Sequence, residues 1–357
     1  MLPYYIMVGV PILFYLLYGG TNQYFNNEKK QRATLWIFFV IVFLLLALRH
    51  KTIGVDLSSY LPRFESVKKL SFSQIFKEFD DEYGYWIFNK IISLLTGDKQ
   101  WFLTIVAAVT LVPLAKLYIK ESEQALLTIS IFLIMPNFGM MFSGLRQTLA
   151  IAIVAISFKY VKEKKLIKFI LLVALAMTFH TSAFIAFLIY PFYHMNITKG
   201  KLFAFIPAII LVLIFNKPIF EFLLEFLGEY GERYEYEETG AYTMIILFIL
   251  FVVFSYFSPD ESKMDKEAIG LRNIGVFSLM LQIFALANPL AMRMNYYYII
   301  FFPLLIPKVI NRAHDRNKPI YRFVGLIMAI FFFIYYMYTA NQASGYMQIY
   351  PYKAFWE

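Results

Sequence analysis

Residues 101–119 read WFLTIVAAVTLVPLAKLYI, an apolar run with a single charged side chain, Lys116. Its length approaches the ~20 residues with which an α-helix crosses the hydrocarbon core of a bilayer. A helix satisfies each backbone N–H and C=O inside its own segment, which lipid cannot do. The run also lacks the alternation of apolar and polar residues that marks the strands of an outer-membrane barrel. This stretch therefore predicts a transmembrane helix in an all-α fold.

Comparable apolar runs recur along the chain. They lie near 2–19, 33–49, 125–142, 144–161, 166–193, 202–216, 241–257, 271–287, 293–307 and 321–340. The run 166–193 is long enough for one tilted span, or for two half-spans that turn at His180–Thr181–Ser182. We expect a polytopic integral membrane protein with about 12 transmembrane helices, forming a single transmembrane domain over residues 1–357.

Composition excludes several classes of protein. Of 357 residues, 60% are hydrophobic and only 16% are charged, against about 25% charged in soluble domains. The absence of cysteine excludes disulfides, thiolate metal sites and cysteine nucleophiles. The four histidines lack metal-ligand spacing. No phosphate-binding GxxxxGK[ST] loop or GxGxxG turn occurs, so no nucleotide cofactor is expected.

Charge sets the expected orientation. The formal charge is +9, which in a membrane protein indicates basic cytoplasmic loops and not a nucleic-acid partner. Basic loops flank the run 166–193 on both sides, which favours a hairpin with His180 at its outer tip. The outer loops are then 50–100 and 217–240, and both termini lie outside. Segment 83–96 is short and amphipathic, so we place it at the outer interface or as a re-entrant helix.

Ionisable residues near membrane depth are costly and mark candidate functional sites. Arg49 ends one apolar run, Arg146 opens another, His180 lies inside a third, and Arg293 lies at the edge of a fourth. In the expected topology all four face the outer side. A single arginine at a span end is also explained by snorkelling to the headgroups. A lone histidine is also explained by packing against a neighbouring carbonyl, yet the grouping of four favours a shared site.

The residue types suggest the chemistry of that site. Arginine forks bind phosphate oxygens bidentately, so several could hold a pyrophosphate without a metal. His180 is suited to donate a hydrogen bond or to move a proton near neutral pH. Asp56, in GVDLSSY, is a second candidate general base for a sugar hydroxyl. Tyr60 and Tyr85 fit either an interfacial aromatic belt or a surface that stacks on sugar rings.

Five short motifs run through nearly the whole chain. They are RHKTIGVDLSSY (49–60), EYGY (82–85), LRQTLA (145–150), FHTSA (179–183) and IYPYKAF (349–355). In this order they resemble the EpsG family, Wzy-like polymerases of bacterial exopolysaccharide and capsule. The resemblance implies a GT-C-like multi-span architecture. It also implies a glycosyltransferase that joins oligosaccharide repeat units on the outer face of the bacterial cytoplasmic membrane.

The resemblance further implies the substrates and a set of site residues. Donor and acceptor would be oligosaccharides linked to undecaprenyl pyrophosphate. The basic cytoplasmic loops suit either a chain-length regulator or anionic membrane lipids as further partners. Arg49, Asp56, Arg146 and His180 match family motif positions, whereas Arg293 is a candidate only for its charge and depth. The catalytic candidates are Asp56, His180 and Arg146, and the substrate-binding candidates are Arg49, Arg293, Tyr60, Glu82, Tyr85 and Gln147. No metal is expected.

Two other classes of function remain open. A flippase or transporter for lipid-linked sugars would also place arginines along a pyrophosphate path, although its charges would lie deep within several spans with access to both faces. A membrane O-acyltransferase acting on glycans would also use histidine and arginine. The grouping of the notable charges on one side favours an enzyme over a transporter.

Overall fold

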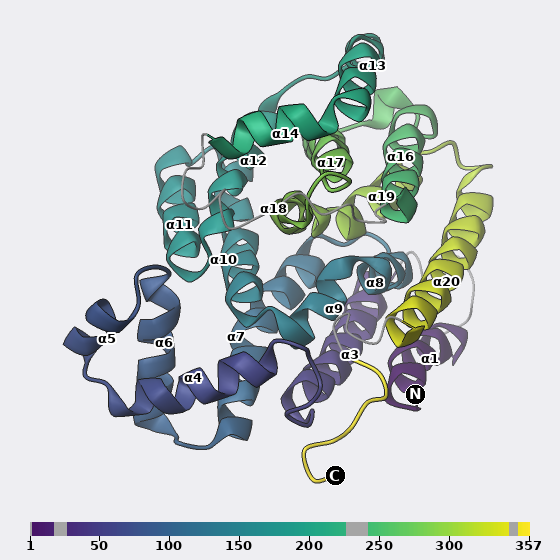
Figure 1. Ribbon diagram of the computed structural model, residues 1–357. Helices are drawn as coiled ribbons and strands as arrows, with labels where there is room; N and C mark the ends of the chain where they lie inside the picture. Colours follow the sequence, from purple (N-terminus) through teal and green to yellow (C-terminus); the bar gives the residue numbers. More distant parts are fainter. Residues whose placement is uncertain (1, 18–26, 226–241, 343–348) are drawn as a thin grey trace. The chain divides into compact units, whose positions relative to one another are not determined.

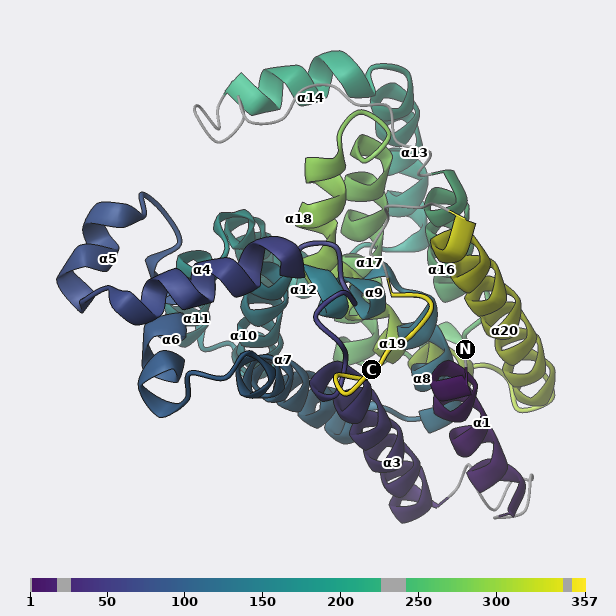
Figure 2. The same cartoon turned by 60° about the horizontal axis from the view of Figure 1, so that its bottom comes forward.

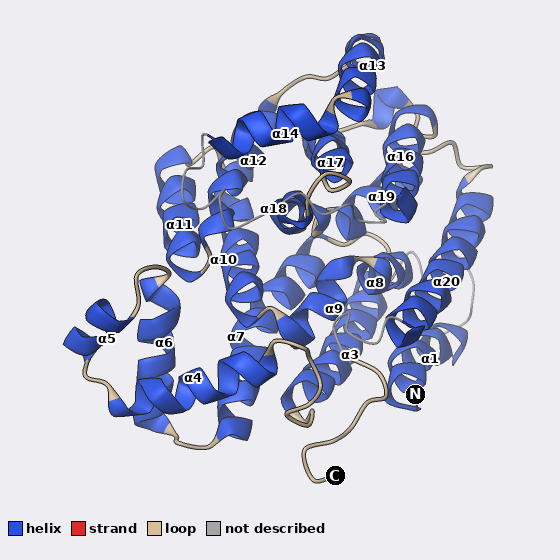
Figure 3. Cartoon of the chain, viewed as in Figure 1, coloured by secondary structure: helices blue, strands red, loops and turns tan. Residues whose placement is uncertain are grey.

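The computed structural model describes residues 2–17, 27–225, 242–342 and 349–357 (Figures 1 and 2). All regular secondary structure in these ranges is helical, and no strand occurs among them (Figure 3). The prediction of an all-α fold is therefore confirmed.

Long apolar helices give the chain its membrane character. In the described part of the chain, four helices are long and apolar enough to cross a membrane: α3 (Glu28–Ala47), α7 (Lys99–Glu121), α17 (Lys266–Phe284) and α20 (Lys318–Gln342). The pair α8 (Ala125–Ile134) and α9 (Pro136–Ser143), bent by 62°, is a fifth candidate. The chain is thus a multi-pass membrane protein, but the predicted count of about 12 spans is not confirmed.

Helix breaks explain part of the difference in span count. Run 125–142 divides where Pro136 opens α9, because proline fits the first turn of a helix but cannot continue the preceding one. Run 293–307 divides into α18 (Pro289–Ile299) and α19 (Phe302–Asn311). Apolar composition alone does not reveal such breaks.

The long run 166–193 also divides, which agrees with the second of the two alternatives we considered, a turn at His180–Thr181–Ser182. Helix α11 (Leu166–Phe179) ends immediately before His180. A 3₁₀-helix, η1 (Thr181–Leu188), and the short helix α12 (Ile189–His194) follow. The alternative of a break at His180 therefore agrees with the structure, whereas the outer placement of that break stays a prediction.

The chain forms two compact units, residues 1–184 with 319–357, and residues 185–318. The first unit contains α1 (Leu2–Leu17) and packs α3 against α7, and α10 (Leu145–Lys162) against both α7 and α11. The second unit contains α13 (Lys199–Ile214), α14 (Asn216–Glu225), α16 (Tyr242–Phe257), η2 (Glu261–Lys263), α17, α18 and α19. That both units belong to one transmembrane domain stays a prediction.

The two predicted outer loops contain helices. Segment 50–100 holds α4 (Leu57–Lys69), α5 (Phe72–Glu78) and α6 (Tyr83–Leu95), which lie together in Figures 1 and 2. Loop 217–240 begins within α14, and its residues 226–240 lie outside the described part of the chain.

Aromatic side chains hold the helices of segment 50–100 together. Phe64 on α4 stacks on Phe102 of α7 with ring centroids 4.3 Å apart. Phe79 stacks on Trp86 of α6 at 3.8 Å. On α6 the buried side chains fall at helical spacing, as expected for an amphipathic helix with one packed face. Its interfacial or re-entrant placement stays a prediction.

The C-terminal segment 349–357 packs on the end of α3. Ala354 pairs with Arg49 as an antiparallel bridge. The amide of His50 donates to the Lys353 carbonyl at 2.9 Å, and the amide of Phe355 donates to the Leu48 carbonyl at 2.8 Å. The motifs 49–60 and 349–355, at opposite ends of the sequence, are therefore neighbours in the first unit.

Candidate active site

Glu82 begins α6 in a strained backbone conformation. Its φ and ψ are 52° and 40°, the left-handed region that non-glycine residues seldom occupy. The Trp86 indole donates to the Asp81 carbonyl at 3.1 Å, and the Tyr85 amide donates to the Glu82 carbonyl at 2.9 Å. Strain of this kind persists where the surroundings over-determine it, commonly at functional sites. The conformation makes Glu82 a candidate for such a site.

The Glu82 carboxylate gathers three donors from α10 and from the break after α11. Its Oε2 pairs with Nη1 of Arg146. Its Oε1 lies 2.6 Å from Nδ1 of His180 and accepts the Thr181 backbone amide at 3.1 Å. The carboxylate side chain is only 4% exposed. Glu82, Arg146, His180 and Tyr60 are referred to below as the Glu82 cluster.

Competing effects set the charge of Glu82. Burial raises the pKa of Glu82. A larger lowering comes from the His180 hydrogen bond, from the charges of His180 and Arg146, and from the Thr181 amide. The pKa of Glu82 therefore lies below its ordinary value. The carboxylate is ionised at neutral pH and holds the groups around it.

His180 has one ring nitrogen held and the other open. It follows the last residue of α11 in an extended conformation, with its amide donating to the Ala176 carbonyl at 3.0 Å. An ionised Glu82 can only accept, so the hydrogen between the two residues is assigned to Nδ1 of His180. In the neutral imidazole Nε2 is then an acceptor. This atom is buried and has no hydrogen-bond partner among the described residues, so it is able to accept a hydrogen bond or a proton from a ligand.

Arg146 is likewise only partly engaged. Its Nε donates to the Tyr60 hydroxyl at 3.4 Å, and its Cζ lies 5.8 Å from the centre of the Tyr60 ring. Its Nη2 makes no hydrogen bond to a described residue, and the side chain is 25% exposed. The guanidinium thus keeps one donor edge for an anionic oxygen while its other edges are fixed.

Two tyrosines line the same region. Tyr60 and Tyr85 meet edge to face with ring centroids 5.8 Å apart. Burial raises the pKa of both, more than the neighbouring Arg146 lowers it, so both phenols stay neutral. The Tyr85 hydroxyl is buried on α6, where it faces the Asn89 side chain.

Asp56 is tied to the segment that leads into α10. Its Oδ2 accepts a hydrogen bond from Oγ of Ser143 at 2.8 Å, and its backbone amide donates to that Ser143 Oγ at 3.1 Å. Gly54 has φ +109°, and a Cβ there would lie 1.8 Å from the Phe142 carbonyl oxygen. Only glycine allows this approach. The Asp56 side chain itself is exposed.

The remaining candidates are Arg49, Gln147 and Arg293. Arg49 is 1% exposed, donates to the Met141 carbonyl at 3.4 Å and stacks 5.6 Å from the Phe142 ring centre. None of its hydrogen bonds reaches Glu82. Gln147 is buried on α10, and Arg293 is exposed on α18 of the second unit. The structure therefore brings together Arg146, His180, Glu82, Tyr60 and Tyr85, while a pyrophosphate role for Arg49 and Arg293 stays a prediction.

Two contacts of this region were missed from the sequence. Thr181 takes part through its backbone amide, which no side-chain pattern reveals. Ser143 anchors Asp56, and its only signal is a hydroxyl placed just before the Gly144–Leu145 start of α10. No group of three or more His, Cys, Asp or Glu residues in the described ranges could hold a metal ion. Metal independence stays a prediction.

The chain was compared with known proteins. The EpsG family profile matches residues 32–354, which is nearly the whole sequence. No curated protein and no solved structure matches it. The motifs that carry Glu82, Arg146 and His180 lie inside the matched region, which ends at Ala354 within the C-terminal motif 349–355. The family points to a polysaccharide polymerase-type function that acts on lipid-linked saccharides, and this multi-pass membrane protein belongs to the EpsG family.

Proposed function

We propose that this protein polymerises oligosaccharide repeat units at the outer face of the bacterial cytoplasmic membrane. The donor is a glycan chain on undecaprenyl pyrophosphate, and the acceptor is a new repeat unit on the same carrier. The observation that carries the proposal is the Glu82 cluster, in which one buried carboxylate orients a histidine and an arginine that each keep an open nitrogen.

The transfer has a simple balance of bonds. A hydroxyl oxygen at the non-reducing end of the acceptor attacks the anomeric carbon of the donor and forms the new glycosidic bond. The bond between that carbon and the pyrophosphate oxygen breaks, and undecaprenyl pyrophosphate leaves with the electron pair. The hydroxyl proton passes to a general base.

His180 is our choice for that base. Glu82 fixes Nδ1 as the protonated nitrogen and stabilises the imidazolium that forms when Nε2 takes up a proton. Because Nε2 is buried, a neighbouring side chain must move before the acceptor hydroxyl reaches it. The exposed carboxylate of Asp56 has no comparable orienting partner beyond Ser143, so we assign it to acceptor binding.

Arg146 serves the leaving group. Its Nη2 is free of hydrogen bonds to the described residues, whereas its Nη1 and Nε are held by Glu82 and Tyr60. A guanidinium fixed in this way is preorganised to stabilise negative charge that develops on the departing pyrophosphate. Tyr60 and Tyr85 present aromatic faces beside it.

The test uses a host that lacks the gene. Wild type, Arg146→Ala and the matched control Arg63→Ala are re-expressed, and lipid-linked and surface glycans are separated on gels. Arg63 is an exposed arginine on α4 outside the Glu82 cluster. We expect wild type and Arg63→Ala to restore a ladder of long chains. Arg146→Ala should leave single repeat units on the outer face, with membrane levels of the variant checked by immunoblot.

Three results would count against the proposal. A full ladder with stably expressed Arg146→Ala removes the arginine from the mechanism. Repeat units trapped on the inner face in the deletion host would identify a flippase. A normal ladder that lacks only acyl groups would identify an O-acyltransferase.

A further inference from the structure

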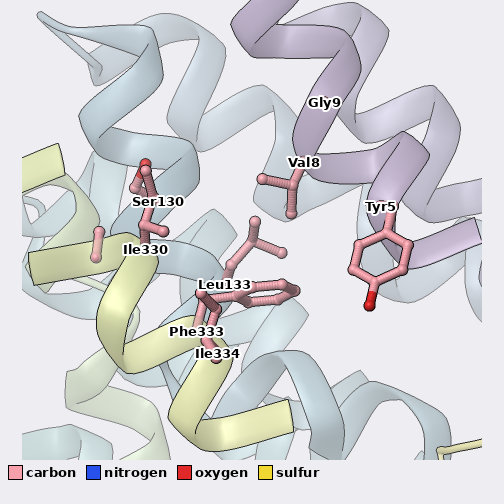
Figure 4. Close-up of a pocket in the computed structure, with 9 residues that line it drawn as sticks. Tyr5, Val8, Gly9, Ser130, Leu133, Ile330, Phe333 and Ile334 are labelled. Carbon is pink, nitrogen blue, oxygen red and sulfur yellow. The ribbon is translucent and has the colours of Figure 1, made fainter. Parts of the chain in front are cut away.

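Two cavities of the first unit differ in the chemistry of their walls. An apolar groove of about 260 Å³ lies among α1, α8 and α20, lined by residues such as Val8, Leu133 and Phe333 (Figure 4). No charged side chain lines it, and nothing in the structure distinguishes one apolar occupant from another. The second cavity, of about 510 Å³, is lined by lysine side chains as well as by apolar ones. Only this one carries a specific inference.

The second cavity, which we name the lysine pocket, lies between the loop after α3 and the start of α4. Its lining comprises Lys51, Thr52, Gly54, Val55, Leu57, Ser58, Leu61, Pro62 and Lys99. Leu57 and Leu61 are buried and form an apolar floor, whereas the two lysines and the hydroxyl residues are exposed. A surface of this kind matches a ligand with an anionic group joined to an apolar chain.

The lysine pocket lies where two membrane spans end. Helix α3 finishes at Ala47, four residues before Lys51, and α7 begins at Lys99. The two ends are adjacent, because two side chains of α7 donate to the Ala47 carbonyl. They are the side-chain amide of Gln100 and the hydroxyl of Thr104, the latter at 3.4 Å. Because both span candidates end here, we expect the pocket to lie at the level where a membrane lipid carries its phosphate.

The ammonium groups of the pocket are weakly compensated. Lys51 forms no ion pair with a described residue. Among the described residues Lys99 pairs only with Glu65, with Nζ and Oε1 3.9 Å apart and both side chains exposed, while the neighbouring Asp98 carboxylate caps α7. An exposed pair at that distance contributes little. Both lysines thus remain available to a phosphate, for which an ammonium acts as a point charge.

The pocket is also joined to the Glu82 cluster by the chain itself. Lys51 and Gly54 belong to the loop that ends at Asp56, and Gly54 contacts the Phe142 carbonyl just before α10. Arg146 lies in the first turn of α10. This close approach fixes the loop that carries Lys51 against the segment that leads to Arg146.

We infer that the lysine pocket binds the diphosphate of a polyprenyl-linked substrate, with Lys51 and Lys99 on the phosphates and Leu57 and Leu61 beneath the first isoprene units. The inference rests on the proposed function and assigns to it two residues that the sequence had not singled out. It also provides cationic groups for the diphosphate in place of Arg49, whose guanidinium is buried.

The test measures binding of farnesyl diphosphate to the full chain in nanodiscs of neutral phosphatidylcholine. Wild type is compared with the double variant Lys51→Ala/Lys99→Ala, the charge-preserving double variant with arginines, and Lys77→Ala. Lys77 is an exposed lysine of α5 outside the pocket, so it controls for net charge. Loss of two charge-assisted contacts at a solvent-accessible site should weaken binding about tenfold. The arginine variant and Lys77→Ala should bind within about twofold of wild type.

Equal binding by wild type and the alanine double variant would overturn the inference. So would equal competition by phosphatidylglycerol, which would mean a general site for anionic lipid. Suppose that the alanine double variant loses diphosphate binding and that wild type never restores the glycan ladder. That result would support the pocket and overturn the proposed polymerase function. A ladder restored by wild type, with diphosphate binding unaffected by the lysines, would keep the polymerase and overturn the pocket.

Discussion

The two units of the molecule each contain a glutamate–arginine pair, and the two pairs differ in what they leave open. In the second unit Arg272 grips Glu261 with both terminal nitrogens, at 3.2 and 2.9 Å, and its Cζ lies 4.2 Å from the centre of the Tyr256 ring. In the first unit Glu82 is shared between Arg146 and His180. Glu261 thus holds both terminal nitrogens of a single arginine, although the buried Nε of Arg272 has no hydrogen-bond partner among the described residues. Glu82 instead divides its carboxylate between two side chains, an arginine and a histidine.

The residues around the two glutamate–arginine pairs also differ. Near Arg272, Arg312 pairs with Asp265 and Lys308 pairs with Glu267 at 3.0 Å. One acid faces each base, as expected where charge must be neutralised at the end of a buried helix. Around Glu82 the backbone is strained, and Nε2 of His180 has no hydrogen-bond partner among the described residues. A carboxylate that holds a single arginine suits a structural role, whereas one shared between a histidine and an arginine at a strained backbone is suited to bind a ligand.

The largest effect on polymer synthesis should come from substitution of His180, whose Nε2 is the proposed proton acceptor. His180→Ala removes the proposed general base, and we expect polymer synthesis to fall at least a hundredfold. The measurement is incorporation of labelled repeat units into long chains by membranes that contain equal amounts of protein. His314→Ala, an exposed histidine of the second unit, is the control and should match wild type. Normal synthesis by His180→Ala would exclude this histidine as the base.

The same chemical change in the two pairs gives a sharper comparison. Glu82→Gln preserves size but removes the charge that stabilises a protonated His180, so we expect about a tenfold loss of rate. A merely structural Glu82 would lower the amount of folded protein and leave the rate per folded molecule unchanged.

Glu261→Gln should have the opposite signature. It weakens a charge-assisted pair and leaves Arg272, which is 1% exposed, with a neutral partner. Because Glu261 is nearly half exposed, we expect a loss of only about 1–2 kcal/mol in stability, with polymerisation per folded molecule unchanged. Thermal unfolding in detergent, followed by size exclusion, measures the first quantity. A fall in specific activity as large as that of Glu82→Gln would erase the distinction between the two pairs.

Sequence patterns revealed the class of fold and the members of the cluster, but not the contacts between them. The run 101–119 lies in α7, a membrane-span candidate, and Arg146 and His180 both bind the Glu82 carboxylate. The count of about 12 spans is not confirmed. Pro136 divides the apolar run 125–142, and hydropathy averages over such a break. Arg49 has the sequence context of an exposed site arginine, yet the C-terminal segment that buries it is three hundred residues away. Long-range pairing of that kind has no local signal in a single sequence.

The smallest expected effect is the dependence of stability on pH, and it tests whether Glu82 is held as an anion. A folded-state pKa below the ordinary value of 4.5 means that the ionised carboxylate stabilises the folded state above that pH. This contribution is lost as the pH falls from 4.5 through the lowered pKa. The difference in melting temperature between wild type and Glu82→Gln should therefore be constant near neutral pH and shrink below about pH 4.5. A difference that persists unchanged into acid would mean that Glu82 contributes through packing, and the proposed hold on His180 and Arg146 would lose its electrostatic basis.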